Sequence, residues 1–209
     1  MNKVTLYIDG RELTAPEGEK LLFIALENDI YIPHLCAVKE EGRPSACCRL
    51  CFVEVDGRKK PVTACTVCVS DGMKVSTRTP AVDRLVRTAF ELLLSDHRLD
   101  CDNCPKNKSC ALQKIAGERG LKLGLPRLNK LEREYIYDDS TEKLTFDSSR
   151  CVLCGKCIAA DKKIEAGAIG FAHRGLNRRI STFYEGKLAD SSCKECLLCV
   201  KACPVGALY

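Results

Sequence analysis

The cysteines of this chain, and above all their spacing, limit what it can fold into. Sixteen of its 209 residues are cysteine, and most of them stand two residues apart in C-x-x-C runs. Thiolates at this spacing, on a tight loop, can point at neighbouring irons of one iron–sulfur cluster. The pattern therefore predicts a protein that holds several clusters and transfers electrons, with no catalytic centre of its own.

The last run of cysteines has the spacing of a bacterial ferredoxin that holds two [4Fe–4S] clusters. Cys193, Cys196 and Cys199 are each two residues apart, and Cys203 follows after three more residues and precedes Pro204. In such ferredoxins the fourth cysteine of a run ligates the other cluster. A partner run begins at Cys151. We therefore predict that one [4Fe–4S] cluster is held by Cys151, Cys154, Cys157 and Cys203.

The partner run carries Asp161 where a fourth cysteine is expected. By the same crossover, Asp161 faces the second [4Fe–4S] cluster, that of Cys193, Cys196 and Cys199. Three interpretations are open: an oxygen ligand to the fourth iron, a bystander beside a labile iron or a [3Fe–4S] cluster, or a solvated acid in a remodelled loop. Because a carboxylate holds iron less firmly than a thiolate does, this cluster is expected to lose iron first under mild oxidation.

A third [4Fe–4S] site is predicted upstream, where one histidine precedes three cysteines. Cys101, Cys104 and Cys110 have no other fourth partner, whereas His97 lies four residues before the first of them. A lone histidine is more often a surface residue, but here the missing ligand favours iron binding. An imidazole in place of a thiolate leaves a cluster less negative, so this cluster is expected to differ from its neighbours in reduction potential.

The six N-terminal cysteines allow two groupings. One is a plant-type [2Fe–2S] set, with a distant cysteine, a close pair and a later fourth. The other is a four-cysteine zinc site of Cys48, Cys51, Cys65 and Cys68. The secondary structure expected around them favours the cluster, for which we predict Cys36, Cys48, Cys51 and Cys65 as ligands.

Two cysteines remain after these assignments. Cys47 and Cys68 stand next to ligand segments, but sixteen ligand positions for four clusters are already filled by fourteen cysteines, His97 and Asp161. Free cysteine behaves as a small hydrophobe in proteins. Each of the two is therefore expected to be a small buried side chain.

Hydrophobic periodicity predicts the elements between the motifs. Residues 4–10 alternate apolar and polar side chains and end in an Asp–Gly turn, and residues 19–29 repeat apolar side chains at helical spacing. A helix is expected from Pro80, because Thr79 can cap it and proline suits its first position. Residues 168–175 and 178–186 are expected to form short strands around a turn.

The chain is thus predicted to be an α+β protein of three modules and a connecting segment. A hairpin, a helix and a cysteine-bearing loop follow one another in the order of a β-grasp ferredoxin, and the two C-x-x-C-x-x-C runs mark a double-cluster module. The predicted parts are a β-grasp plant-type [2Fe–2S] ferredoxin domain at 1–79, a small helical [4Fe–4S] domain with one histidine and three cysteine ligands at 80–120, a linker or strap at 121–148 and a bacterial-type double [4Fe–4S] ferredoxin domain at 149–209.

Composition excludes several other classes of function. The formal charge of +5 is offset by the charge of thiolate-bound clusters, so a nucleic-acid partner is not expected. The N-terminal residues lack the apolar core of a signal peptide, and no apolar stretch is long enough to cross a membrane. A cytoplasmic protein with reduced thiols is expected rather than a disulfide scaffold. No G-x-G-x-x-G or phosphate loop is present, so NAD(P) and flavin are expected on other subunits.

The order of motifs, with the strings IPHLC, CRLCFVEV, TACTVCVSDGMKV, CALQ, RCVLCGKC, HRG and ACPVGAL, resembles one protein family over essentially the entire chain. It is similar to the N-terminal part of the large iron–sulfur subunit of respiratory complex I. It is equally similar to the diaphorase iron–sulfur subunit of NAD-reducing hydrogenases. Because the chain stops at Tyr209, directly after the last motif, the diaphorase-type subunit is expected to be the nearer relative.

This resemblance implies an electron-transfer subunit of a flavin-dependent NAD(P)H oxidoreductase complex. Its expected partners are a flavin- and NAD(P)H-binding iron–sulfur subunit and a hydrogenase, formate dehydrogenase or similar catalytic subunit. The expected cofactors are one [2Fe–2S] and three [4Fe–4S] clusters. Two alternatives are a free-standing polyferredoxin, which would have no stable partner, and a zinc-binding interaction protein, which would contain little iron.

Overall fold

The computed structural model describes residues 2–209, and the chain divides into two compact units, Met1–Phe90 and Glu91–Tyr209. Met1, the first residue of the predicted first domain, lies outside the described residues. Both units combine helices with short sheets, as expected for a mixed chain. The finer division into 1–79, 80–120, 121–148 and 149–209 stays a prediction.

The first unit begins with the hairpin expected from the alternating pattern. Strands β1 (Lys3–Ile8) and β2 (Arg11–Pro16) pair antiparallel across Asp9 and Gly10, whose φ angles of 49° and 80° are both positive. Positive φ at both central residues is typical of the tight turn that matches strand twist, and Asp–Gly tolerates it. Helix α1 (Leu21–Glu27) follows, within the predicted helical segment.

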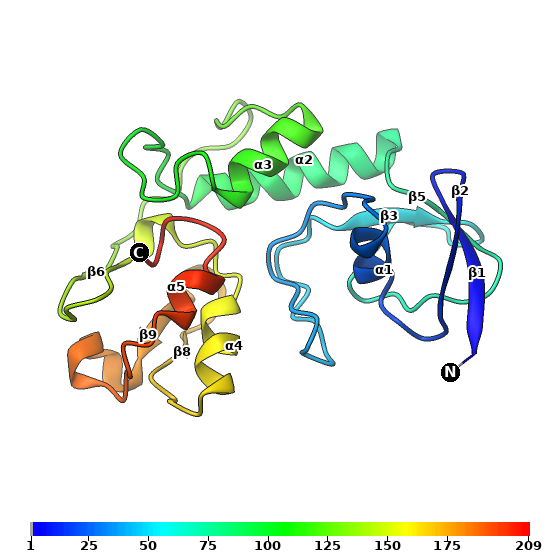
Figure 1. Cartoon of the computed structure of the whole chain (residues 1–209). Coiled ribbons are helices and arrows are strands. Elements are labelled where there is room, and N and C mark those ends of the chain that lie inside the picture. The colour runs from blue at the N-terminus through cyan, green and yellow to red at the C-terminus, as the bar shows by residue number, and fades with distance from the viewer. Residues whose placement is uncertain (1) are drawn as a thin grey trace. The chain divides into compact units, whose positions relative to one another are not determined.

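Three further strands complete a five-stranded sheet in the order β2-β1-β5-β3-β4. Strand β5 pairs parallel with β1 at the centre and antiparallel with β3, and β4 pairs antiparallel with β3. Figure 1 shows α1 beside this sheet. The added strands are β3 (Phe52–Val55), β4 (Val62–Thr63) and β5 (Met73–Ser76).

The core of this unit lies between α1 and the sheet. Leu6 and Ile8 of β1, Leu22 of α1 and Val53 of β3 are fully buried and belong to one apolar cluster. Cys51 and Cys65 are buried in the same cluster. The cysteine-bearing loops are therefore fixed by the packing of the core itself.

Helix α2 (Pro80–Ser95) begins where the sequence predicts it. The hydroxyl of Thr79 accepts a hydrogen bond from the backbone N–H of Val82, at 3.2 Å, and the carbonyl of Thr79 accepts one from Asp83. This is the N-cap arrangement, with proline in the first helical position. The backbone N–H of His97 donates to the carbonyl of Leu94, so the helix leads directly into the His97 motif.

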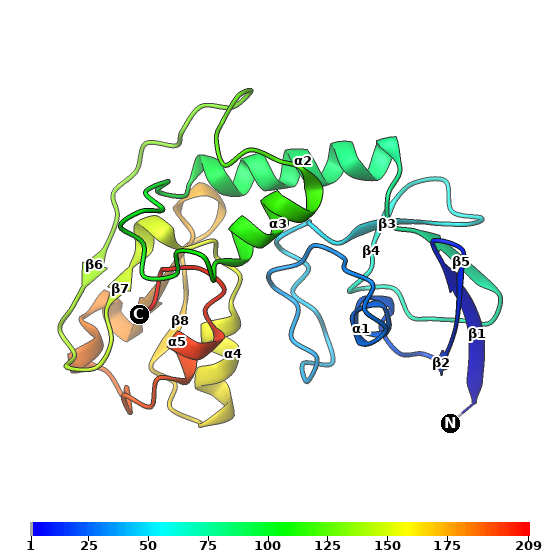
Figure 2. The ribbon, with the colours of Figure 1, turned by 45° about the horizontal axis from the view of Figure 1, so that its top comes forward.

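The second unit has three further helices and two small sheets (Figure 2). Helix α4 packs against α5 and against β8. Strands β8 and β9 form an antiparallel hairpin within the two segments expected to be strands around a turn. The helices are α3 (Ala111–Arg119), α4 (Lys156–Lys163) and α5 (Leu198–Ala202), and the strands are β6 (Tyr137–Asp138), β7 (Phe146–Asp147), β8 (Ile169–Ala172) and β9 (Arg179–Thr182).

The segment from 121 to 148 is an irregular strap that ends in the β6–β7 pair (Figure 2). It is attached at several points: the N–H of Leu131 donates to the carbonyl of Ser95, and Arg133 forms an ion pair of 2.6 Å with Asp96. Its last residues are buried, including Phe146. Hydrogen bonds and ion pairs thus anchor the strap along its length.

Candidate metal centres

Four buried thiols of the first unit lie in two close pairs. The sulfurs of Cys36 and Cys48 are 3.4 Å apart, and Cys51 hydrogen-bonds Cys65. All four are buried and none forms a disulfide. Hydrogen bonds from Cys47 and Cys48 lower the pKa of Cys36, whereas the bond to Cys36 raises the pKa of Cys48. These are the four cysteines of the predicted [2Fe–2S] set.

The expectation for the two remaining cysteines is wrong, because both are exposed. Cys68 lies 3.2 Å from the ammonium of Lys20, and Cys47 lies 3.6 Å from the hydroxyl of Ser45. Each belongs to a loop at the surface, where a short side chain can remain in solvent.

The second unit brings together the three cysteines that follow His97. The N–H of Cys104 donates to the carbonyl of Cys101, and Cys110 stands at the N-terminal end of α3. Burial raises the pKa of Cys110, and the neighbouring thiols of Cys104 and Cys101 add to the rise.

His97 itself is buried, with 7% of its surface exposed. Burial lowers the pKa of its imidazole to about 4, so the ring is neutral at pH 7. Its Nδ1 atom is buried and has no hydrogen-bond partner among the described residues. A neutral ring with an unpartnered buried nitrogen suits a metal ligand, because such an atom is costly unless something binds it.

Two residues that the motifs did not single out lie against Cys104. Arg150 is buried, and a Cβ atom placed on Gly206 would lie 2.5 Å from the Cys104 sulfur and 3.7 Å from the Arg150 Cδ. Both stand beside recognised ligands in the sequence, Arg150 before Cys151 and Gly206 three residues after Cys203. In the sequence, both residues stand next to ligands of the double-cluster module. Their positions therefore suggested a role at that module and not at Cys104.

The four cysteines of one set predicted for the double-cluster module line a common cavity. One cavity of the second unit is lined by all four thiols of the predicted set, with apolar residues such as Val152 and Ile180 between them. Cys203 comes from the far end of the chain and meets the three thiols of the earlier run. The four cysteines are Cys151, Cys154, Cys157 and Cys203.

The two C-x-x-C-x-x-C loops share an unusual backbone. Leu153 and Gly155 have φ angles of 52° and 76°, and the corresponding residues Glu195 and Leu197 have 46° and 60°. In each loop the N–H two residues after the first cysteine donates to its sulfur, at 3.4 Å. Left-handed backbone at non-glycine residues is costly, so its repetition indicates a geometry required by the site.

Asp161 lines a separate cavity of about 60 Å³ together with Cys193 and Cys199. Asp161 is 8% exposed, and its Oδ2 accepts a hydrogen bond of 3.0 Å from the N–H of Ala168. The interpretation of Asp161 as a solvated acid therefore does not fit. Cys196, of the same run as Cys193, is exposed.

The chemistry of these sites fits iron–sulfur clusters. Burial raises the pKa of Cys151 to about 12 and that of Cys199 to about 11, so both remain protonated unless a positive centre replaces the proton. Among residues 2–209, no three His, Cys, Asp or Glu side chains are arranged around a single metal ion. Thiols that surround a cavity instead suit a multi-iron cluster, which is larger than one ion.

Family models match three successive parts of the chain. A "2Fe-2S iron-sulfur cluster binding domain" matches residues 1–80, and an "NADH-ubiquinone oxidoreductase-G iron-sulfur binding region" matches 87–122. A "4Fe-4S dicluster domain" matches 150–207. The chain therefore has both [2Fe–2S] and [4Fe–4S] domains.

Among curated relatives, the NAD-reducing hydrogenase HoxS subunit gamma of Cupriavidus necator is 31% identical over 208 residues, which cover 98% of this chain and 86% of that subunit. The chain belongs to this family of hydrogenase iron–sulfur subunits. The resemblance drawn from the motifs is confirmed. The NADP-reducing hydrogenase subunit HndD of Solidesulfovibrio fructosivorans is 34% identical over 213 residues, covering all of this chain but 36% of that relative.

The fold of this hydrogenase subunit family is also found in a solved structure. A chain of the NAD+-reducing [NiFe]-hydrogenase, crystallised in the H2-reduced state, matches with a TM-score of 0.89 at 30% identity. The match covers 99% of this chain and 86% of that one. The chain spans about a quarter to a third of the first curated relatives it matches. Within its described residues, none of the helices combines the length and apolar character needed to span a membrane.

Proposed function

We propose that this chain transfers electrons between a flavin-containing subunit that oxidises NAD(P)H and a catalytic subunit such as a hydrogenase or formate dehydrogenase. The observation that carries the proposal is the convergence of Cys151, Cys154, Cys157 and Cys203 on one cavity. Three of these thiols come from the middle of the second unit and the fourth from its end. A cubane cluster whose ligands are shared between two runs requires this arrangement.

Four cluster sites are proposed, in three modules. The sheet order β2-β1-β5-β3-β4 with α1 supports a β-grasp [2Fe–2S] module. The repeated left-handed loops support a double [4Fe–4S] module of the bacterial type. The proposed sets are Cys36, Cys48, Cys51 and Cys65 for [2Fe–2S]; His97, Cys101, Cys104 and Cys110; Cys151, Cys154, Cys157 and Cys203; and Cys193, Cys196, Cys199 and Asp161 for the three [4Fe–4S] clusters.

Asp161 is proposed as the oxygen ligand of the last cluster. The N–H of Ala168 holds Oδ2, which fixes the carboxylate beside the cavity that Cys193 and Cys199 also line and leaves Oδ1 available to a ligand there. A buried carboxylate with one oxygen held in this way suits a positive centre, because an uncompensated buried charge is costly. Iron bound in this way is held less firmly than by thiolate, so this cluster remains the one expected to lose iron first.

When bound, the clusters supply one-electron acceptors and donors. The chain itself fixes their positions and excludes water from them. Cys51 and Cys65 are held by loops packed into the core of the first unit, and Cys151 is enclosed by apolar residues of the second. Hydrogen bonds to the sulfurs and the burial of each site tune the potentials.

The partners are proposed from the relatives. Subunit gamma belongs to a hydrogenase that reduces NAD, and HndD to one that reduces NADP. A flavin- and NAD(P)H-binding iron–sulfur subunit on one side and a catalytic oxidoreductase subunit on the other would suit such a chain. A cytoplasmic location is proposed, because thiols stay reduced there.

The test is anaerobic purification of the chain with its native partner subunits, followed by metal and sulfide analysis and graded-reduction EPR. About fourteen irons per chain, with signals of one [2Fe–2S] and three [4Fe–4S] clusters, is the expected result. Co-purifying flavin and catalytic subunits would identify the electron donor and acceptor. Zinc with little iron would overturn the proposal, and a full set of clusters without any stable partner would indicate a free polyferredoxin.

A further inference from the structure

A buried arginine connects the ligand segments of two proposed clusters. Arg150 precedes Cys151, a proposed ligand of the double-cluster module, yet its side chain lies beside Cys104, a proposed ligand of the His97 site. A Cβ atom placed on Gly206 would be 2.5 Å from the Cys104 sulfur and 3.7 Å from the Arg150 Cδ. The side chain of Arg150 is 9% exposed, as is that of Asp147, and the Arg150 Nε lies 3.0 Å from the Asp147 Oδ2. Both charged groups are thus removed from solvent beside the thiols.

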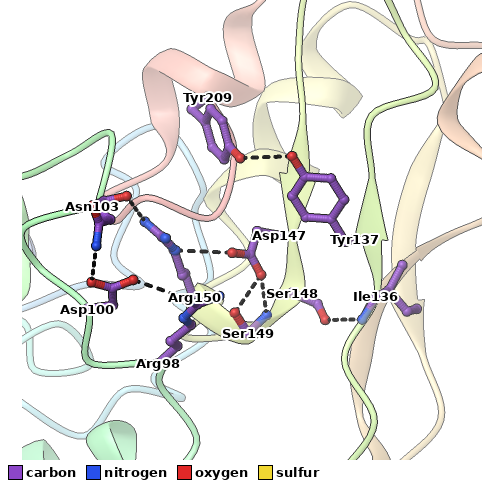
Figure 3. A network of polar contacts seen from close by, with 10 residues as sticks. All are labelled: Arg98, Asp100, Asn103, Ile136, Tyr137, Asp147, Ser148, Ser149, Arg150 and Tyr209. Carbon is purple, nitrogen blue, oxygen red and sulfur yellow. Dashed lines mark hydrogen bonds and ion pairs between the residues drawn. The ribbon is translucent and has the colours of Figure 1, made fainter.

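The network around Arg150 holds its guanidinium in one place (Figure 3). Its Nη1 donates to the carbonyl of Asn103, at 3.2 Å, and Asn103 in turn donates to Asp100. Asp147 accepts from both the N–H and the hydroxyl of Ser149, at 3.0 and 2.5 Å. A guanidinium fixed at several points loses little entropy when it also binds a thiolate.

Asp147 does not fully compensate the positive charge of Arg150. The Nε–Oδ2 contact is an ion pair, but Nε has no aligned hydrogen-bond acceptor among the described residues. The buried cation therefore lies beside the Cys104 thiol with part of its charge uncompensated.

From this geometry we propose that Arg150 is a positioning residue that sets the reduction potential of the His97 cluster and ties that cluster to the neighbouring one. Its guanidinium donates to the carbonyl of Asn103, the residue before Cys104, and its backbone continues directly into Cys151. One-electron reduction adds a negative charge to a cluster, which a nearby fixed cation favours, so Arg150 raises the potential. The proposal rests on the proposed cluster function.

Arg150 and Asp147 carry opposite charges, so removing one or the other should shift the reduction potential of the His97 cluster in opposite directions. Arg150→Gln removes the cation, and the potential of the His97 cluster is expected to shift to more negative values. Asp147→Asn removes the compensating anion and is expected to shift it the other way. Arg150→Lys keeps the charge and is expected to stay near the wild type. Arg98→Gln is the matched control, because Arg98 is exposed and paired with Asp100 in the same motif.

The potential is measured by EPR-monitored redox titration of the purified complex, after iron analysis of each variant. Removing Arg150 alone leaves Asp147 buried and unpaired, which can prevent folding. The double variant Arg150→Gln/Asp147→Asn removes both charges, and its potential is expected to be more negative than that of Asp147→Asn, because it also lacks the cation. Equal potentials in Asp147→Asn and the double variant, each with full iron, would overturn the proposal. Absence of [4Fe–4S] signals in the wild type would instead refute the cluster function.

Discussion

Gly206 lies directly against Cys104, so closely that a Cβ atom at position 206 would be 2.5 Å from the Cys104 sulfur. Such a distance requires a shift of the sulfur or of the loop that carries Gly206. A thiolate held by iron cannot move freely, so Gly206→Ala is expected to disrupt the His97 cluster. Metal analysis should show a loss of about four irons per chain, and EPR should show loss of that cluster's signal.

Gly124→Ala is the control for this change. Gly124 lies in the strap, and a Cβ there would meet nothing within 4 Å. Its iron content should equal that of the wild type. If Gly206→Ala also keeps every cluster, the close approach to Cys104 does not constrain the site.

The Asp161 carboxylate is expected to determine how firmly the last cluster holds its fourth iron. In Asp161→Ala no oxygen remains to bind this iron, so a [3Fe–4S] EPR signal should appear after mild oxidation before any other cluster is damaged. In Asp161→Cys a thiolate replaces the carboxylate, and the cluster should resist the same oxidation better than the wild type does.

The exposed Asp190 offers a matched acid for this experiment. Asp190→Ala should leave the oxidation behaviour unchanged, because this residue lies in solvent three positions before Cys193. Identical behaviour of the wild type and Asp161→Ala would show that the carboxylate does not bind iron.

The exposed cysteines separate the [2Fe–2S] grouping from the zinc alternative. Cys68→Ser and Cys47→Ser should retain the [2Fe–2S] signal and the full iron content, since both thiols lie at the surface. Cys65→Ser should lose the signal, with about two irons fewer per chain. Loss of a metal in Cys68→Ser would instead favour the site of Cys48, Cys51, Cys65 and Cys68.

The buried imidazole of His97 is expected to make the stability of its site decrease as the pH falls. Its pKa is lowered to about 4 by burial, below the ordinary value near 6.5, so the folded state binds fewer protons than the unfolded state between these values. The stability contributed by the neutral ring is present above about pH 6.5 and decreases as the pH falls toward 4, by at most about 3 kcal/mol. Binding of iron to the ring would act in the same direction.

The measurement is the urea concentration at which the His97 cluster signal is lost, taken over a series of pH values. In His97→Cys the dependence between pH 6.5 and 4 should be reduced. His173→Gln, which changes an exposed histidine, should behave as the wild type. A midpoint that is independent of pH in the wild type would contradict the prediction.

Local spacing made much of this protein predictable. The turn at Asp9 and Gly10 and the start of α2 after Thr79 depend on a few neighbouring residues, and both occur where the sequence places them. The crossover of Cys203 to the earlier run follows from the ferredoxin pattern, because two such loops close on each other in one way. The turn and the start of α2 are thus encoded within short stretches of chain.

The burial of side chains depended on packing and was not predictable. The sequence indicated small buried thiols at positions 47 and 68, yet the loops carry both to the surface. It left the environment of Asp161 open, and only the approach of Ala168 showed that the carboxylate is buried and held.

The sequence by itself determined which residues can hold clusters and in what order, because ligand chemistry requires particular side chains at short spacings. The tertiary structure alone decided which other groups touch those ligands. Arg150 and Gly206 reach Cys104 across 46 and 102 positions of the chain. Contacts at such separations depend on how the whole unit packs, and no local pattern in the chain records them.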